Sequence, residues 1–122
     1  MNLNCSLSGR AETDLTNQYR WYLDNATPAV AERFLAAFDE TLSQLSHLPT
    51  LGRPRRFRSP ELRGIRSLRL SQGFEALLVF YRSSDTGISI ERVMHGARDL
   101  ERRLIEPPEE CPMERVGWGA HS

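Results

Sequence analysis

The segment that decides the fold runs from Phe74 to Asp99 and reads FEALLVFYRSSDTGISIERVMHGARD. Two apolar runs, at residues 74–82 and 88–93, flank a polar turn at residues 83–87, and this pattern predicts a β-hairpin. The first run is apolar on both faces, which is typical of a strand covered on both sides, so we place it at the centre of a sheet. In the second run the alternation breaks at Val93, which predicts a β-bulge there.

Two helices are predicted ahead of this hairpin. Apolar residues recur at helical spacing from about residue 9 to residue 25 and again from residue 28 to residue 48. Ser8 is the predicted N-cap of the first helix, and Thr27 that of the second, with Pro28 at its first position. Residues 9–48 therefore predict a helical hairpin, preceded by a short strand at residues 4–8.

The remaining segments complete a β-α-α-β-β-β-α order. Residues 51–60 form a basic surface loop with two prolines, residues 63–70 form an extended segment, and Leu100 with Leu104 predicts a short C-terminal helix. The order predicts an α+β fold in which the N-terminal helical hairpin packs on a small antiparallel β-sheet. We expect one domain at residues 1–104 and a C-terminal tail at residues 105–122.

The composition of the chain indicates its expected compartment and whether disulfides, metals or cofactors are expected. No apolar run approaches the roughly 18 residues of a membrane span, and no export signal is evident, so we expect a soluble cytoplasmic protein without membrane contact. The two cysteines, Cys5 and Cys111, are expected to be unpaired thiols. The three histidines have no ligand spacing, so no metal and no cofactor is expected.

Charge is distributed unevenly along the 122 residues, although the formal net charge is zero. Residues 53–103 carry 12 arginines against 6 acidic residues, while the segments on either side are acidic, and the chain has no lysine. Guanidinium groups bind anions through paired hydrogen bonds but do not transfer protons. The candidate partner-binding residues are Arg53, Arg55, Arg58, Arg66, Arg69, Arg82, Arg92, His95 and Arg98, with Arg56 in the same basic loop. The alternative is that each arginine pairs with a nearby acid or lies in water.

Five short motifs carry a resemblance to a known family. They are Leu48-Pro49, LGRPR at residues 51–55, GIRSL at 64–68, LVFYR at 78–82 and RVMHGARD at 92–99. In this order and spacing they closely resemble the ParE toxins of bacterial toxin–antitoxin pairs, within the RelE/ParE superfamily. The resemblance implies a small α+β toxin that poisons DNA gyrase, is held inactive in a hetero-oligomer with a cognate antitoxin, and contacts DNA only through that antitoxin.

Some relatives in this superfamily instead cut mRNA on the ribosome, which requires a base, an acid and a cation. Arg98 would correspond to their corner arginine, and His95 and Tyr81 could supply acid–base groups. Those relatives also use lysines and a tyrosine in the final segment, whereas this chain has no lysine and no tyrosine after Tyr81. We therefore expect a gyrase inhibitor without catalytic residues; an inert member that only binds antitoxin is a third interpretation.

Direct DNA binding is not expected from the sequence. The chain contains no helix dense in cations and no recognisable DNA-reading motif.

Overall fold

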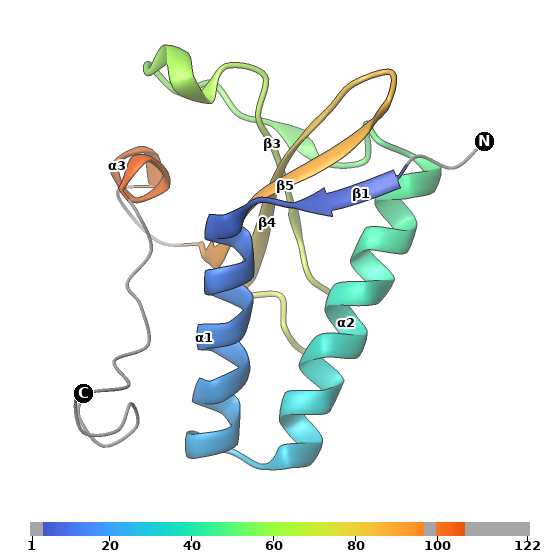
Figure 1. Ribbon diagram of the computed structural model, residues 1–122, viewed down its shortest axis with the longest axis vertical. Coiled ribbons are helices and arrows are strands. Elements are labelled where there is room, and N and C mark those ends of the chain that lie inside the picture. Colours follow the sequence, from blue (N-terminus) through green and yellow to red (C-terminus); the bar gives the residue numbers. More distant parts are fainter. Residues whose placement is uncertain (1–3, 97–99, 107–122) are drawn as a thin grey trace.

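A computed structural model describes residues 4–96 and 100–106 (Figure 1). The elements are β1 (Asn4–Leu7), α1 (Gly9–Asn25), α2 (Pro28–His47), β2 (Arg53–Pro54), the 3-10 helix η1 (Pro60–Leu62), β3 (Arg66–Arg69), β4 (Leu77–Ser83), β5 (Gly87–His95) and α3 (Leu100–Ile105). The predicted helical hairpin, central β-hairpin and short last helix are all present. The expected basic loop also contains β2, and η1 follows it; neither element was predicted.

The N-terminal helices begin at the predicted caps. The Ser8 hydroxyl accepts a hydrogen bond from the amide of Ala11 at 3.0 Å, and the Thr27 hydroxyl accepts one from Val30 at 3.1 Å. Each cap satisfies an amide that has no partner inside its helix, so both starts are fixed by local sequence.

The α+β fold is confirmed, but the sheet is mixed. Its strand order is β1-β5-β4-β3-β2, with β4 in the middle as predicted. The β2–β3, β3–β4 and β4–β5 pairs are antiparallel, whereas β1 runs parallel to β5. Only strands joined by tight turns must be antiparallel, and two helices and three strands separate β1 from β5 along the chain.

The predicted bulge exists two residues earlier than expected. Phe80 pairs with Arg92 and Tyr81 pairs with Ile90, which leaves Glu91 without an opposite residue. The extra residue shifts the alternation, so Val93 lies in the same buried cluster as Ile90 despite the odd spacing between them. The break seen at Val93 in the sequence is therefore the consequence of a bulge at Glu91.

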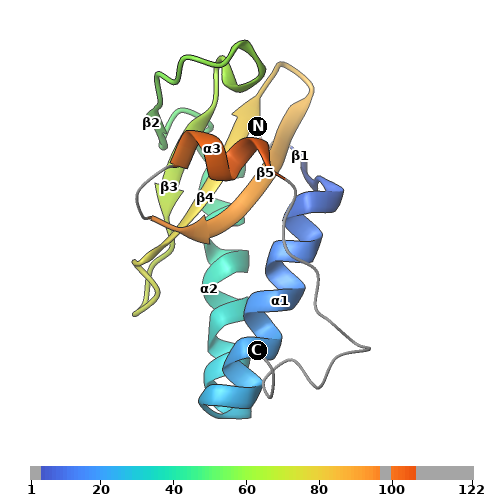
Figure 2. The ribbon, with the colours of Figure 1, turned by 90° about the vertical axis from the view of Figure 1, so that its left-hand side faces the viewer.

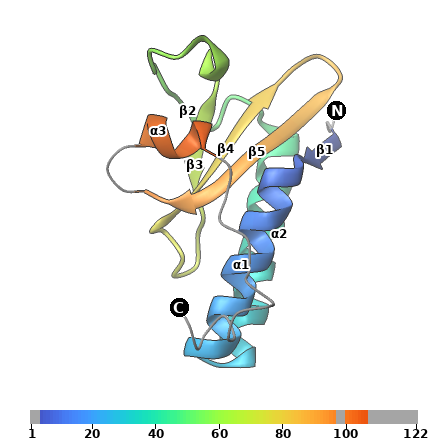
Figure 3. The same ribbon diagram turned by 60° about the vertical axis from the view of Figure 1, so that its left-hand side comes forward.

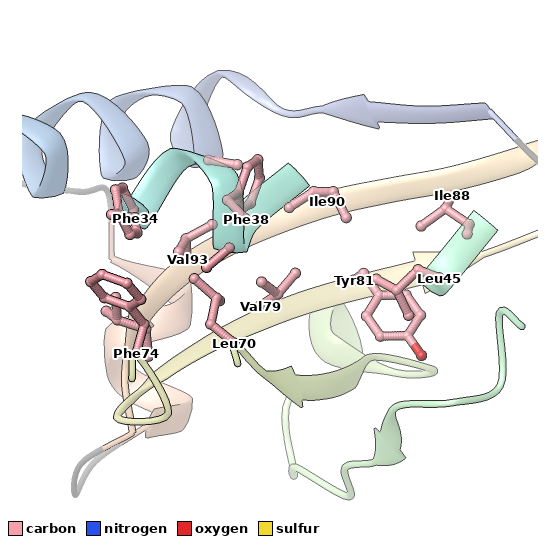
Figure 4. Close-up of a cluster of buried hydrophobic side chains, with 13 residues drawn as sticks. Phe34, Phe38, Leu45, Leu70, Phe74, Val79, Tyr81, Ile88, Ile90 and Val93 are labelled. Atoms are coloured by element: carbon pink, nitrogen blue, oxygen red, sulfur yellow. The ribbon is translucent and has the colours of Figure 1, made fainter. Parts of the chain in front are cut away.

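Both faces of β4 are covered, by different layers. The helical hairpin lies on one face of the sheet, and α3 crosses the opposite face (Figures 2 and 3). The larger cluster, on the helix side, brings residues of α2 against alternate residues of β4 and β5 (Figure 4). The smaller cluster joins Leu78 and Phe80 of β4 to Leu104 of α3. Thus α3 completes the second face of the core.

Candidate partner-binding surface

Arg92 is an internal residue. Its side chain is 6% exposed, and its Nε and Nη2 atoms donate to the two carboxylate oxygens of Asp14 at 2.7 and 3.0 Å. Its Nη1 atom donates to the carbonyls of Arg103 and Glu106 at 2.8 and 3.1 Å, and Asp14 also accepts the Val93 amide at 2.9 Å. Every group of this ion pair is used to join α1, β5 and the end of α3, so Arg92 has no group free for a partner.

A cavity of about 230 Å³ lies beside this ion pair and is lined by residues of α1, β5 and α3. Arg10 of α1, on its rim, donates to the carbonyls of Leu104 and Ile105 at 3.3 and 2.9 Å. Because the last carbonyls of a helix have no partners within it, Arg10 and Arg92 together cap the C-terminal end of α3.

Arg82 holds η1 against β4. Its Nε atom donates to the Arg63 carbonyl at 3.2 Å, another nitrogen donates to the Glu61 carbonyl, and Nη1 lies 3.4 Å from the carboxylate of Glu91. Ser89 donates to the same carboxylate at 3.0 Å. Arg82 is half-buried and mostly engaged within the fold.

Tyr81 and Arg66 fix the start of the basic loop. The Tyr81 hydroxyl, inside the core, donates to the Pro49 carbonyl at 2.8 Å and accepts the Gly52 amide at 2.7 Å. Arg66 donates to the carbonyls of Thr50 and Gly52 at 3.3 and 2.7 Å. A Cβ atom on Gly52 would lie 2.4 Å from the Tyr81 hydroxyl, so only glycine fits this close approach. Burial raises the pKa of the Tyr81 phenol above its ordinary value of 10.0. The phenol is protonated at neutral pH even without this shift, as its donation to Pro49 requires.

Of the three residues considered for nuclease chemistry, the structure describes Tyr81 and His95, and it does not bring these two together. Tyr81 faces the helix-side core, whereas His95 is exposed at the far end of β5 and pairs with Leu77. Tyr81 lies four residue steps along β4 from Leu77, about 13 Å. The His95 carbonyl accepts a hydrogen bond from Arg103 at 3.2 Å. Arg98 lies outside the described residues.

The described arginines of the candidate set that do not hold the fold together lie on β2, on the loop after β2 and on β3. Arg53 pairs with Ser67, so its side chain lies on the face opposite the helical hairpin. Arg55 is half-buried on the same face and donates to the Ser67 hydroxyl at 2.8 Å, and Arg69 donates to the Glu75 carbonyl at 2.8 Å. Burial lowers the pKa of the Arg55 guanidinium, and the nearby charges of Arg53 and Arg69 lower it further. Three like charges are therefore held together on this face.

The loop continues this group of cations. Arg56 and Arg58 are exposed, and within the described ranges their guanidinium groups make no hydrogen bond or ion pair. The loop backbone is nevertheless held, because the carboxylate of Glu101 in α3 accepts the amides of Arg58 and Ser59 at 3.2 and 2.7 Å. We call Arg53, Arg55, Arg56, Arg58 and Arg69 the arginine surface.

The predicted partner-binding set thus divides in two. Arg53, Arg55 and Arg69 are brought together, and Arg58 is exposed in the loop after β2. Arg66, Arg82 and Arg92 are engaged within the fold, and His95 lies at the far end of β5. Asp14 and Glu101, which organise these two regions, were not singled out from the sequence. Nothing local marks either carboxylate, since Asp14 meets Arg92 across 78 residues and Glu101 meets the loop across more than 40.

Residues 4–96 and 100–106 contain neither a cluster of metal ligands nor a membrane-spanning helix. No three histidine, cysteine or acidic side chains there are grouped so as to hold a metal ion. None of the helices in the same part of the chain has the length and apolar character needed to cross a membrane.

The sequence of this chain matches the model of one protein family. The family model described as ParE toxin of the type II toxin–antitoxin system, parDE, matches residues 6–100. No curated protein matches the sequence.

Two solved structures share the fold. The chromosomal ParDE toxin–antitoxin system from P. aeruginosa superposes with a TM-score of 0.61 at 22% identity, covering 76% of this chain and 95% of that one. The YoeB dimer from Staphylococcus aureus superposes with a TM-score of 0.52 at 20% identity, covering 80% of this chain and all of that one.

Proposed function

The chain belongs to the ParE toxin family of type II toxin–antitoxin systems, and from this premise we propose that it stops growth by binding DNA gyrase, and that a cognate antitoxin neutralises it. It acts in the cytoplasm, where that target and antitoxin are made. We place the toxin domain at residues 1–104, around the family match at residues 6–100.

The observation that carries the proposal is the arginine surface. Its exposed guanidinium groups have no carboxylate partner in the described part of the chain, and the loop that bears them is fixed at both ends by Tyr81 and Glu101. A fixed cationic surface accelerates and orients association with an acidic protein surface. Such a surface supports action by binding rather than by catalysis.

An antitoxin partner is supported by the family and by the ParDE system that shares the fold. Of the residues expected to meet a partner, we assign direct contact to Arg53, Arg55, Arg58 and Arg69. We assign a supporting role to the other three described arginines, Arg66, Arg82 and Arg92, because their groups hold the fold together. His95, at the far end of β5, and Arg98 remain proposed contacts.

Ribosome-dependent mRNA cleavage is the second candidate, because relatives in the superfamily perform it. The separation of the buried Tyr81 from the exposed His95 disfavours this chemistry, since a base and an acid must both reach one phosphodiester. Appearance of cleaved mRNA on translating ribosomes, abolished by Arg98→Ala, would establish it over gyrase inhibition. An inert member that only binds antitoxin would leave growth unchanged.

Expression with and without the neighbouring antitoxin gene tests toxicity and its neutralisation. We expect growth arrest from this chain alone and normal growth when the antitoxin gene is expressed with it. Purified protein should then block supercoiling by gyrase or trap cleaved DNA. Unaffected gyrase turnover at micromolar protein would contradict the proposed target.

A further inference from the structure

The arginine surface is a local excess of positive charge on a chain whose formal net charge is zero. Residues 53–60 contain four arginines and no acidic residue. The carboxylate of Glu101, which contacts the loop backbone, accepts two loop amides rather than a guanidinium group. The carboxylate of Glu75, whose carbonyl accepts from Arg69, accepts the Gly73 amide. Like charges held together without a counterion favour the binding of an anion, which would relieve their repulsion.

The arginine surface can orient a protein partner through its charge, but it has no apolar core of its own for such a partner to cover. Protein interfaces have an apolar core, usually with aromatic anchors, surrounded by charges. Here the one aromatic residue of the loop, Phe57, is half-buried and packs into the α3-side cluster. The nearest exposed leucines, Leu48 and Leu51, precede Gly52, which packs on the Tyr81 ring of the helix-side core. Phosphodiester backbones need cations but no apolar anchor.

We propose that the arginine surface binds the phosphodiester backbone of double-stranded DNA, so that the toxin contacts DNA directly as well as the topoisomerase that holds it. The second half of this statement rests on the proposed function; the DNA contact itself does not. The sequence has neither a cation-dense helix nor a DNA-reading motif, but cations on a strand edge and its loop can contact phosphates without either one.

The geometry suits a row of phosphate contacts. Arg53 and Arg55 lie two residues apart on one face, about 6.6 Å along the strand, and Arg69 lies on that face from the neighbouring segment. The planar guanidinium group offers paired hydrogen bonds to phosphate oxygens. Since these contacts would be made to the backbone, we expect binding that is independent of base sequence and strongly dependent on salt.

The test measures binding of the full chain to a short fluorescent DNA duplex by anisotropy, without gyrase, from about 50 to 200 mM salt. We expect saturable binding at low salt, and each lost phosphate contact should reduce the slope of log K against log salt by about 0.9. Arg53→Gln, Arg56→Gln and Arg58→Gln should each show this reduction. Arg33→Gln is the charge-matched control, because Arg33 is exposed on α2 and outside the arginine surface, and it should leave the slope unchanged.

Several results would overturn the inference. One is the absence of binding to the DNA duplex at low salt. Another is that Arg58→Gln and Arg33→Gln have equal slopes of log K against log salt. A third is stronger binding to an RNA duplex than to the DNA duplex. Loss of antitoxin binding, but not of DNA binding, in Arg58→Gln would also overturn it and assign the surface to the antitoxin. Gyrase inhibition measured in parallel separates the two proposals: DNA binding with no effect on gyrase would contradict only the proposed function, and gyrase inhibition without DNA binding would contradict only this inference.

Discussion

Two regions of this molecule use arginine in opposite ways. At the junction of α1, β5 and α3, the guanidinium group of Arg92 is buried and every donor assigned to it meets a carboxylate or a carbonyl of the same chain. On the arginine surface, the guanidinium groups of Arg56 and Arg58 are exposed and have no such partners in the described residues. The same residue type is structural in one region and available for binding in the other, so substitutions in the two regions should separate stability from activity.

The largest expected effect is at the junction. Arg92→Gln leaves the Asp14 carboxylate buried without its cation, and breaking a buried ion pair typically costs about 3–5 kcal/mol. Denaturant unfolding followed by circular dichroism measures the loss. The exposed pair Arg102 and Glu106 provides the control, since Arg102→Gln should cost no more than about 1 kcal/mol. Equal losses for the two variants would show that the junction does not carry the stability assigned to it.

The next effect concerns the anchor of the basic loop. Tyr81→Phe keeps the ring but leaves the Gly52 amide without its acceptor, which should cost about 1–3 kcal/mol. Amide hydrogen exchange at Gly52 should accelerate by more than the loss of global stability explains. Tyr19→Phe is the matched control, because the Tyr19 hydroxyl bonds the exposed carboxylate of Glu32. Unchanged exchange at Gly52 would contradict an anchoring role for Tyr81.

A smaller effect is expected at the other end of the loop. Glu101→Gln retains one amide oxygen as an acceptor but removes the charge and the second acceptor, and we expect a loss of about 0.5–1.5 kcal/mol. Gyrase inhibition should weaken as well, because the loop is held less firmly. Hydrogen exchange at Arg58 and Ser59 gives the direct measurement. Full protection of both amides in the variant would be evidence that other contacts hold the loop.

The smallest effect on stability is expected on the arginine surface itself. Arg56→Gln and Arg58→Gln remove exposed side chains without partners in the described part, so each should change the unfolding free energy by no more than about 0.5 kcal/mol. Growth arrest on expression should nevertheless weaken, whereas Arg33→Gln should leave it intact. If a variant with both substitutions still arrested growth, the arginine surface would not be the part of the molecule that carries activity.

The sequence predicted those features of the fold that depend on interactions between residues close together in the chain. The caps at Ser8 and Thr27, the helical hairpin and the doubly covered strand β4 follow from spacing and residue type, and all are present. The parallel pairing of β1 depends on packing between distant segments, and the bulge at Glu91 appeared in the sequence only through its effect on Val93.

The site was less predictable, because it depends on which arginine finds a partner. Arg58 and Arg92 look alike in the sequence, and only the fold brings Asp14 to one of them across 78 residues.

The central claim is that this toxin acts through exposed arginines rather than through a catalytic group. The most direct measurement is gyrase supercoiling with wild-type protein and with the double variant Arg56→Gln, Arg58→Gln, at matched folding by circular dichroism. We predict that the wild type blocks supercoiling and that the double variant loses most of this inhibition while its unfolding free energy is unchanged. Equal inhibition by both proteins, or none by the wild type, would contradict the account.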